Sequence, residues 1–417
     1  MPLNDILKKK CSIDIIEFLE AGISSDEENM SLLVQLTDEV DAATASSYKE
    51  AIDNSNAEVI KEIPFINTNL VSIRANKLEE LLKNPAVRFV TFNHTYFAVL
   101  ELSTKVIAEP TVPTINLDGS GVTVAVLDTG IYPHKDLITP NNRIIAFYDA
   151  FKKRESEPFD DNGHGTHCAG CVAGNGISSE GRFHGLAPNA KLVGVKVLRG
   201  AEGGGPTDVI VHGIKWCIEN KQRFGIKVMS LSLSREAYVL SENDPLCKAI
   251  RMAQLAGIIV VVAAGNSGRD GSQTIGSPGI EPSIITVGAT NHKNTLDKND
   301  DVIAEFSSRG PTIDGLIKPD IVAPGTNIIS LRAPSSSYDR EYPQNHINES
   351  YTTMSGTSMS TPIVAGCVAL LLQKKPDSKP SGIKEALRNG AVDIFHNENN
   401  AGKGYTNLQG ALNKLNV

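Results

Sequence analysis

The chain has 417 residues, of which 41% are hydrophobic, 5% aromatic and 21% charged, and glycine occurs 35 times. This length accommodates two or three domains with a large core, and the composition excludes collagen, coiled coils and disordered chains. The formal net charge of −8 is the opposite of the basic excess that is typical of nucleic-acid binding, so we expect no nucleic acid as a partner.

The N-terminal segment, residues 1–30, is a polar leader whose pattern indicates no function. It carries Lys8–Lys10, but Asp14 and Glu17 interrupt the stretch where a signal peptide would have its apolar region. The longest apolar runs, such as Ile258–Ala264, are far shorter than the ~20 residues of a membrane helix. We therefore expect no membrane association and a cytoplasmic location, with export by another route left open.

Six cysteines are scattered along the chain, a pattern that implies no disulfide framework. Cys168 and Cys171 form a CxxC pair within a stretch of small residues. Free cysteine packs as a small hydrophobic side chain, so we expect these thiols to be reduced and buried.

Residues 31–99 are predicted to form a small α+β unit. Apolar and polar residues alternate in its strand-like segments, and Asn76 is expected to cap its second helix. The order strand, helix, strand, strand, helix, strand is typical of a ferredoxin-like fold. The predicted strands are Leu32–Leu36, Glu58–Ile66, Leu70–Arg74 and Val87–Phe92, and the predicted helices are Asp41–Ile52 and Asn76–Leu82.

Residues 100–118 contain Pro110 and Pro113 and show no periodicity, which is typical of a linker. From residue 119 to 417, apolar runs alternate with helical segments. This alternation predicts an α/β domain with a parallel sheet covered by helices on both faces. The predicted strands are Val122–Leu127, Lys191–Leu198, Lys227–Leu233, Ile258–Ala264, Ile284–Val287 and Ile321–Ala323, and the predicted helices are Gly165–Ala173, Asp208–Asn220, Pro245–Ala256 and Ser358–Gln373.

Asp128 ends the first apolar run of this domain and is followed by Thr129 and Gly130. A carboxylate at the carboxyl end of a parallel strand lies where open α/β sheets place their sites. For this residue taken alone, an aspartate that turns the chain before glycine is the simpler alternative.

His164 lies between Gly163 and Gly165 at the start of a stretch of small residues. Its ring therefore has space to meet both a nucleophile and an orienting acid. His167 and Cys168 follow closely, and with His164 they form the alternative of a metal site. The spacing lacks the glutamate of the HExxH pattern, which disfavours a metallohydrolase.

Ser358 lies within Gly356–Pro362, at the junction between a loop and a predicted helix. A serine there feels the positive end of the helix dipole, and a simple N-cap is the alternative. Asn266 follows the buried run Ile258–Ala264, and its side-chain amide is a suitable donor for an oxyanion. For Asn266, a chain turn with Gly265 is the alternative.

The strings Asp128–Gly130, His164–His167 and Gly356–Met359 occur in the chain order Asp, His, Ser. Together they resemble the subtilisin (subtilase) family of serine peptidases, whose founding member is the reference example of this order. The resemblance covers roughly residues 120–415 and extends to the N-terminal unit, which looks like a subtilase propeptide. It implies a serine endopeptidase whose partners are polypeptide substrates.

The resemblance also implies a role for each of these residues. His164 takes the proton from Ser358 as the serine attacks the scissile carbonyl, and it returns the proton to the leaving amine. Asp128 holds the imidazole in place, and Asn266 with the backbone N–H of Ser358 holds the oxyanion.

Substrate-binding segments follow from the same resemblance. Ser232, Leu233 and Ser234 match the strand that lines the family's cleft. The family usually has glycine where this chain has Ser234, and we expect the serine to narrow one side of the pocket for P1, the residue before the scissile bond.

The opposite edge of the cleft and the rest of the P1 pocket are matched by small residues. A roomy pocket of this kind implies a preference for large apolar P1 residues and broad tolerance elsewhere. The matching residues are Gly203, Gly204 and Gly205 at the edge, Gly276 at the pocket floor, and Ala264 and Gly265 beside it.

Family members often bind calcium, so calcium is the one cofactor that the resemblance implies. Asp136 resembles a ligand of a common family site, whereas the matching loop, residues 174–185, departs from the family's pattern. A surface turn is the alternative for Asp136.

Residues 31–99 are expected to act as a folding template, because a large sheet with non-local contacts folds slowly. They are also expected to act as an inhibitor. The last strand of this unit would cover the cleft until the zymogen cuts itself within Ala98–Val106. Three alternatives remain: a regulatory domain that stays attached, a catalytically silent fold that only binds, and a metal-dependent hydrolase.

Overall fold

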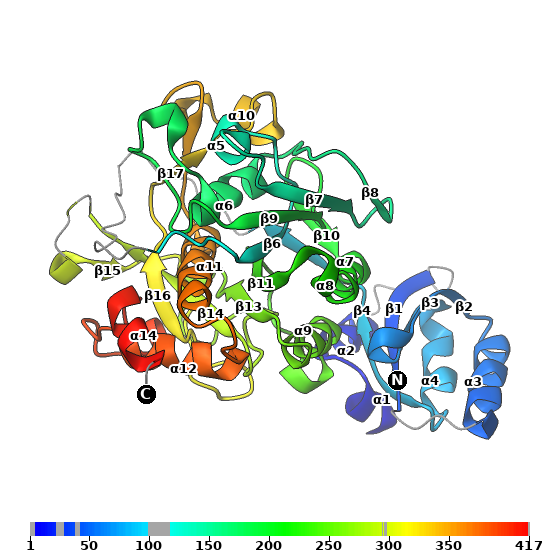
Figure 1. Ribbon diagram of the computed structural model, residues 1–417. Coiled ribbons are helices and arrows are strands. Elements are labelled where there is room, and N and C mark those ends of the chain that lie inside the picture. Colours follow the sequence, from blue (N-terminus) through cyan, green and yellow to red (C-terminus); the bar gives the residue numbers. More distant parts are fainter. Residues whose placement is uncertain are drawn as a thin grey trace.

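A largely parallel β-sheet organises the C-terminal part of the chain in this computed structural model, which describes residues 5–21, 29–37, 42–98, 117–293, 295 and 298–415 (Figure 1). The strands follow the order β15-β14-β13-β11-β6-β9-β7-β8, and β16 pairs with β14. All neighbours are parallel except β14 with β15 and β7 with β8. The strands are β6 (Thr123–Asp128), β7 (Ile144–Asp149), β8 (Arg154–Glu155), β9 (Lys191–Lys196), β11 (Ile226–Leu231), β13 (Ile259–Ala263), β14 (Ile285–Asn291), β15 (Val302–Ile303) and β16 (Ile321–Pro324).

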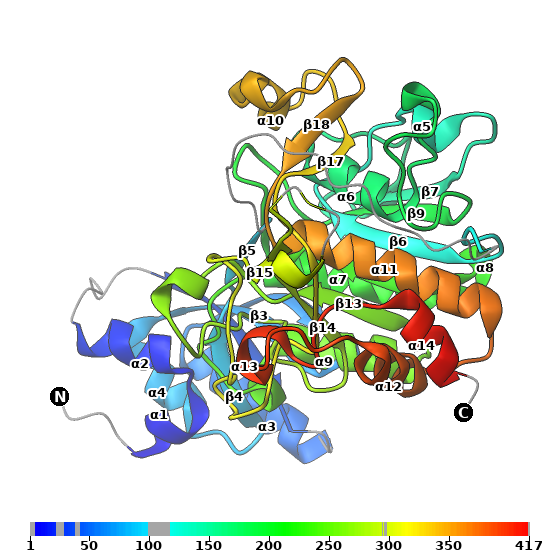
Figure 2. The same cartoon turned by 90° about the vertical axis from the view of Figure 1, so that its left-hand side faces the viewer.

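Helices cover both faces of this sheet, as the sequence predicts. In β6, Val124 and Val126 belong to one apolar cluster, whereas Ala125 and Leu127 belong to another. The first cluster contains residues of α6 and α11, and the second contains residues of α7 and α9. Figure 2 shows α11 lying along the sheet. The helices are α6 (His164–Ala173), α7 (Thr207–Glu219), α9 (Pro245–Leu255), α11 (Thr357–Lys374), α12 (Pro380–Gly390) and α14 (Leu408–Leu415).

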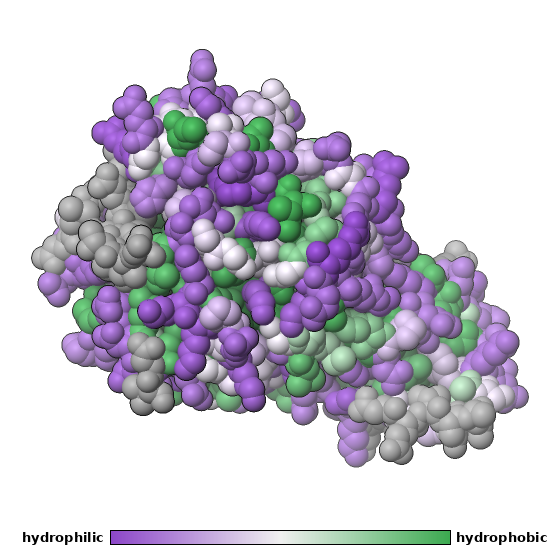
Figure 3. All heavy atoms as spheres, viewed as in Figure 1, coloured by the Kyte–Doolittle hydropathy of each residue, from purple (hydrophilic) through white to green (hydrophobic). Residues whose placement is uncertain are grey.

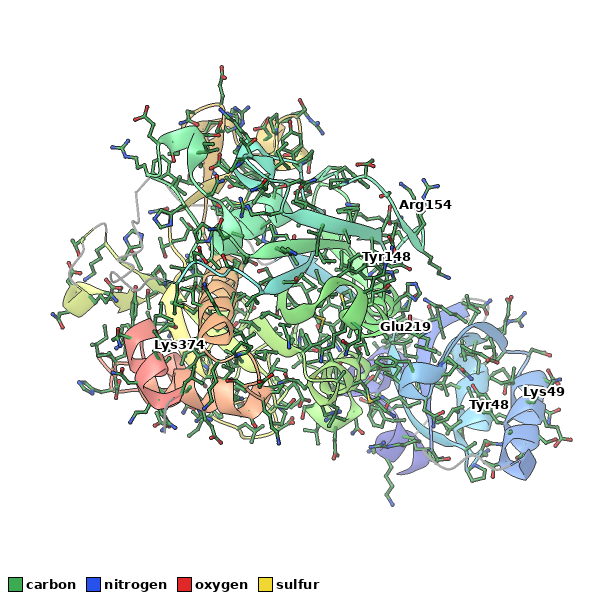
Figure 4. All side chains as sticks on the ribbon, in the orientation of Figure 1. Tyr48, Lys49, Tyr148, Arg154, Glu219 and Lys374 are labelled. Atoms are coloured by element: carbon green, nitrogen blue, oxygen red, sulfur yellow. The ribbon has the colours of Figure 1, made fainter. Side chains whose placement is uncertain are left out.

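Shorter elements complete this part of the chain. Tyr148 of β7 stacks on Trp216 of α7 with ring centroids 4.6 Å apart, and Figure 4 shows Tyr148 and Glu219 on the same side of the molecule. The other helices are α5 (Lys135–Ile138), α8 (Lys221–Phe224), α10 (Ser337–Glu341) and α13 (Glu398–Ala401), and β17 (Ile328–Leu331) pairs with β18 (Tyr351–Met354).

The N-terminal unit has a four-stranded antiparallel sheet in the order β2-β3-β1-β4. One face packs against helices around Val34, Val71 and Leu81. The helices α1 and α2 belong to the same unit, because Ile15 lies in its core and Ser12 N donates to Val90 O at 3.0 Å. The elements are α1 (Asp5–Lys10), α2 (Ile13–Glu20), β1 (Asn29–Leu36), α3 (Ala42–Asn54), β2 (Glu58–Ile63), β3 (Thr68–Arg74), α4 (Leu78–Leu82) and β4 (Val87–Phe92).

The other face of this small sheet packs against the C-terminal part. Leu33, Ile66 and Leu70 share an apolar cluster with Leu246 and Ile250 of α9. Figures 1 and 2 both show the N-terminal unit beside α9. Its sheet is therefore covered by its own helices on one face and by the larger part of the chain on the other.

Three predicted elements differ from the structure. The predicted strand Glu58–Ile66 ends at Ile63 and continues as a 3-10 turn, Pro64–Ile66, because proline cannot donate to a strand ladder. The prediction that Asn76 caps a helix was wrong, since Asn76 lies inside a 3-10 turn and α4 begins at Leu78 with no side-chain cap. The predicted strand Lys227–Leu233 divides at Ser232 into β11 and β12 (Leu233–Ser234).

All six cysteines are unbridged and buried, as was predicted for Cys168 and Cys171. Within the described ranges, no helix has both the length and the apolar character needed to cross a bilayer. The face drawn in Figure 3 is mostly hydrophilic, with apolar residues interspersed.

Candidate active site

Asp128 and His164 meet at the carboxyl end of β6. The distance from His164 Nδ1 to Asp128 Oδ1 is 2.7 Å, and the two side chains are 0% and 1% exposed. Because a carboxylate only accepts hydrogen bonds, Nδ1 carries a hydrogen, and in the neutral form of the ring Nε2 is then an acceptor. Thr129 N also donates to Asp128 Oδ1, at 2.7 Å. This arrangement fixes the imidazole in the form that a general base needs.

Two glycines make this approach possible. A Cβ at position 165 would contact Gly130 O and would lie 3.0 Å from Asp128 Cβ, so a side chain there would push α6 away from β6. Gly163, directly before α6, has φ +104°, in the left-handed region that favours glycine. The glycines on either side of His164 therefore allow α6 to lie close against β6.

Ser358 is the second residue of α11 and is fully buried. Its Oγ donates to Ser232 O at 3.1 Å, and Ser232 Oγ donates to Ser358 O at 2.8 Å. Cys168 Sγ lies 3.5 Å from Ser358 O and 3.8 Å from His164 Nδ1. The cysteine thus packs between the segments that carry the serine and the histidine.

Asn266 follows β13 and is held by the residue before Ser358. Its Oδ1 accepts from Thr357 N at 3.1 Å and from Thr357 Oγ1 at 3.0 Å. Its Nδ2 is buried and has no hydrogen-bond partner in the described part of the chain. A buried donor without a partner costs free energy unless a ligand accepts its hydrogen bond. An oxyanion beside Ser358 would be such an acceptor.

The alternative of a metal site at His164, His167 and Cys168 finds no support in the geometry. His167 Nε2 lies 3.0 Å from Ile328 O, so this ring points to β17, and burial lowers the pKa of His167 to about 3. Asp128, His164 and Cys168 do have ligand atoms within 4.8 Å of one another. However, His164 Nδ1 and Asp128 Oδ1 are already hydrogen-bonded to each other. Burial also raises the pKa of Cys168, which keeps its side chain a thiol.

Asp160 is a buried residue that the sequence analysis missed. Its Oδ1 accepts from Thr129 Oγ1 at 2.9 Å and from Gly163 N at 2.9 Å. Its Oδ2 accepts from Thr166 N at 2.9 Å and Thr166 Oγ1 at 2.6 Å. One carboxylate thereby ties the turn after Asp128 to the start of α6. Its position four residues before His164 was the available signal.

The predicted substrate-binding edges hold a segment of the chain itself. β5 (Thr95–Ala98) lies between β10 (Gly204–Pro206) and β12 and is antiparallel to both. The register places position 96 opposite Gly205, position 97 opposite Gly204 and Ser234, and position 98 opposite Leu233. Gly203 precedes β10 in a turn with φ +63°. The structure therefore brings Gly204, Gly205, Leu233 and Ser234 together around one extended strand.

The residues predicted for the P1 pocket lie next to one another. A Cβ at position 276 would contact Ser234 Oγ, and a Cβ at position 265 would lie 3.2 Å from the same atom. Gly276 N donates to Ala264 O at 2.9 Å. The Ser234 hydroxyl therefore occupies space between two glycines.

The surroundings of Asp136 do not fit a calcium ion. Asp136 is fully buried, its Oδ1 accepts from Ser178 N at 3.0 Å, and its Oδ2 accepts from Tyr351 OH at 2.5 Å. Arg143 donates to the main-chain oxygen of Asp136. Calcium needs several free oxygen ligands, whereas here hydrogen-bond donors and a guanidinium take these places. The alternative of a surface turn is wrong, because Asp136 is fully buried.

The comparisons with known proteins agree with this site. The model of the subtilase family matches residues 119–411. The chain is 47% identical over 357 residues to serine protease AprX of Bacillus subtilis (strain 168), covering 83% of this chain and 79% of AprX. It is 32% identical over 397 residues to subtilisin E of the same strain, covering 94% and 92%.

One solved structure with a similar fold is fervidolysin from Fervidobacterium pennivorans, described as a keratinolytic enzyme related to subtilisin. It matches with a TM-score of 0.69 at 25% identity, over 94% of this chain and 62% of that chain. This chain thus spans less than two thirds of fervidolysin. The family match, the similarity to AprX and the Asp128–His164 pair all agree. The chain belongs to the subtilase family and is a subtilisin-like serine endopeptidase.

Proposed function

We propose that this peptidase cuts its substrates with Ser358 as nucleophile, His164 as general base and acid, and Asp128 as the group that orients the imidazole. The observation that carries this proposal is the 2.7 Å bond from His164 Nδ1 to Asp128 Oδ1. It leaves Nε2 to take a proton from a neighbouring hydroxyl. Asn266, whose Nδ2 has no partner in the described part of the chain, would then donate to the oxyanion.

The N-terminal unit is proposed to keep the enzyme latent. β5 takes the position of a substrate strand between β10 and β12, and His164 and Ser358 are both 0% exposed. Lys61 forms an ion pair of 2.8 Å with Asp208 in the first turn of α7, and Thr207 N donates to His94 O at 2.9 Å. A peptide reaches the triad only after this unit has been displaced.

Self-processing would remove the unit. The proposed junction, Ala98–Val106, begins at the last residue of β5, and its residues from 99 onward lie outside the described ranges. β5 pairs with β12, and Ser232, directly before β12, contacts Ser358 Oγ, so a cut by the chain's own serine would fall just after β5. The unit would then act as a propeptide, a partner that folds with the enzyme and inhibits it.

The specificity proposed for P1 is broad, with a preference for large apolar residues limited on one side by Ser234. Its basis is the row of small residues Ala264, Gly265 and Gly276 around the Ser234 hydroxyl. No calcium ion at Asp136 forms part of the proposal.

One experiment tests these proposals together. Full-length wild type and Ser358→Ala are incubated, intact masses are followed, and a peptide library is added. We expect the wild type to shorten by a cut within Ala98–Val106 and then to cleave after large apolar residues, while Ser358→Ala stays full length and inactive. Processing of the alanine variant by itself would contradict self-cleavage, and library cleavage by it would contradict the role of Ser358.

A further inference from the structure

Tyr96 of β5 has a completely enclosed side chain. It is 0% exposed and lies opposite Gly205 in the register of β5 with β10. Its ring is part of the apolar cluster that also contains Leu233 and Leu246. The cleft therefore has a closed pocket that accepts a whole tyrosine side chain.

The end of this pocket is polar. The distance from Tyr96 OH to Ser277 Oγ is 3.0 Å. Ser277 Oγ donates in turn to Asp244 Oδ2 at 2.7 Å, and Arg235 donates to the same oxygen at 3.1 Å. Ser277 and Asp244 are 0% exposed, and the Arg235 side chain is 7% exposed. Four polar groups thus form one continuous buried chain from the phenol to the guanidinium.

The direction of each hydrogen bond in this chain is determined by Asp244. Its Oδ1 accepts from Leu246 N at 2.8 Å and Cys247 N at 3.2 Å at the start of α9, and its Oδ2 pairs with Arg235. The carboxylate accepts only, so the hydrogen of Ser277 points to it. Ser277 Oγ can then only accept from the pocket's occupant, and the occupant must donate.

The wall of the pocket favours an aromatic ring. The Arg235 guanidinium lies over the Tyr96 ring, 5.1 Å from its centroid, a distance at which a cation attracts an aromatic face. Burial raises the pKa of Tyr96, so the phenol keeps its hydrogen and remains a donor. The pocket therefore matches an aromatic ring with a hydroxyl donor at its far end.

The register shows which substrate position this pocket binds. Position 96 is opposite Gly205, position 97 opposite Ser234 and position 98 opposite Leu233, so the next residue of a strand in this register faces Ser232. Ser358 Oγ contacts Ser232 O. The residue facing Ser232 is thus the one whose carbonyl meets the nucleophile, and the pocket binds the fourth residue before the scissile bond.

We infer that the pocket formed by Arg235, Asp244 and Ser277 makes this peptidase select tyrosine over phenylalanine at the fourth residue before the scissile bond of its protein substrates. The inference rests on the proposed function, in which β5 occupies the path of the substrate. A site built to bind a hydroxyl discriminates against the analogue that lacks it, because here the buried Ser277 Oγ would keep its bond to Asp244 but lose the donor that it accepts from.

The test compares peptides that differ only at this position, using the full chain after it has processed itself. We expect kcat/KM for tyrosine to exceed that for phenylalanine by about tenfold to a hundredfold. 4-Aminophenylalanine, which donates, should recover part of the loss. Equal kcat/KM for the tyrosine and phenylalanine peptides would overturn the inference, and this comparison needs no variant of the enzyme.

The variant Ser277→Ala identifies the source of the preference. It should reduce the ratio of tyrosine to phenylalanine to within about twofold, whereas the control Ser156→Ala, at an exposed site, should keep it. A ratio that survives Ser277→Ala would contradict the inference. If neither peptide is cut and a fluorophosphonate fails to label the wild type, the proposed function falls, and the inference falls with it.

Discussion

Individual residues that do no chemistry hold the triad in place. Asp160 accepts five hydrogen bonds, from Thr129, Asn162, Gly163 and twice from Thr166. Thr129 Oγ1 in turn accepts from Gly165 N at 2.9 Å. The separation of Asp128 and His164 therefore depends on a carboxylate that touches neither the nucleophile nor the substrate.

Asp160→Asn should lower kcat by about tenfold to a hundredfold with little change in KM. An amide of the same size presents a donor where the carboxylate accepted from Thr166, which shifts the start of α6 and misplaces His164. Steady-state kinetics with thermal unfolding as a control would measure this. A variant that loses stability but keeps kcat would show that Asp160 is only structural.

Tyr351→Phe should lower the free energy of unfolding by about 1–3 kcal/mol, because it leaves a buried oxygen of Asp136 without its donor. The matched control is Tyr342→Phe, whose hydroxyl makes an exposed bond with Glu341. Chemical denaturation in the Ser358→Ala background would measure both. The difference in free energy of unfolding between Ser358→Ala with and without Tyr351→Phe should be the same with and without EDTA. A difference that disappears in EDTA would indicate a cation at Asp136.

Helix α6 is the element that carries both the proposed general base, His164, and a second buried histidine, His167. Burial lowers the pKa of His167 from 6.5 to about 3, and its Nε2 is 3.0 Å from Ile328 O. Between these two pKa values the unfolded chain binds a proton at His167 that the folded chain does not. The free energy of unfolding therefore falls as the pH drops through this window, by up to about 1.4 kcal/mol per pH unit.

His167→Gln should remove this part of the pH dependence, because glutamine does not titrate. We expect the free energy of unfolding of Ser358→Ala, measured with denaturant, to fall more steeply from pH 6.5 toward pH 4 than that of the Ser358→Ala, His167→Gln double variant. The difference in slope should correspond to one bound proton. Equal slopes for the two proteins would show that His167 is protonated in the folded state.

The sequence predicts some elements well because their signal is local. The long apolar run before Asp128 and the small residues after His164 correspond to β6 and α6. β5 was not predicted, because its partners β10 and β12 lie more than a hundred residues away in the chain. Arg235, Asp244 and Ser277 were missed for the same reason, since only the folded chain brings them to Tyr96. The donors around Asp136 include Tyr351, which no local pattern connects to it.

At the scale of the whole molecule, the N-terminal unit packs against α9 of the larger part of the chain. The contacts that hold the unit are partly polar: Lys61 pairs with Asp208, and Gln35 Nε2 donates to Asn243 O at 2.6 Å. Both contacts lie at the start of α7 or next to α9, the helices on which the unit packs. The proposed latency would therefore depend on surfaces away from Asp128, His164 and Ser358.

Lys61→Ala should make the freshly prepared full chain react faster with a fluorophosphonate, by about twofold to tenfold, because loss of a partly buried ion pair weakens the docking of the unit. Lys77→Ala, which removes an exposed pair with Glu80 on the unit's own surface, is the control and should react like the wild type. Equal labelling of all three proteins would contradict a role for this contact in latency.

The most direct test of the triad is to locate the residue that a fluorophosphonate modifies. Wild type, Ser358→Ala and Asp128→Asn are labelled with a fluorophosphonate, and the modified residue is mapped by peptide mass spectrometry. A variant that does not process itself is first cleaved by added active enzyme and purified. We expect a single modification on Ser358 in the wild type, none in Ser358→Ala, and much slower labelling of Asp128→Asn, with peptide hydrolysis following the same order. Labelling of another residue, or hydrolysis by purified Ser358→Ala, would contradict this expectation.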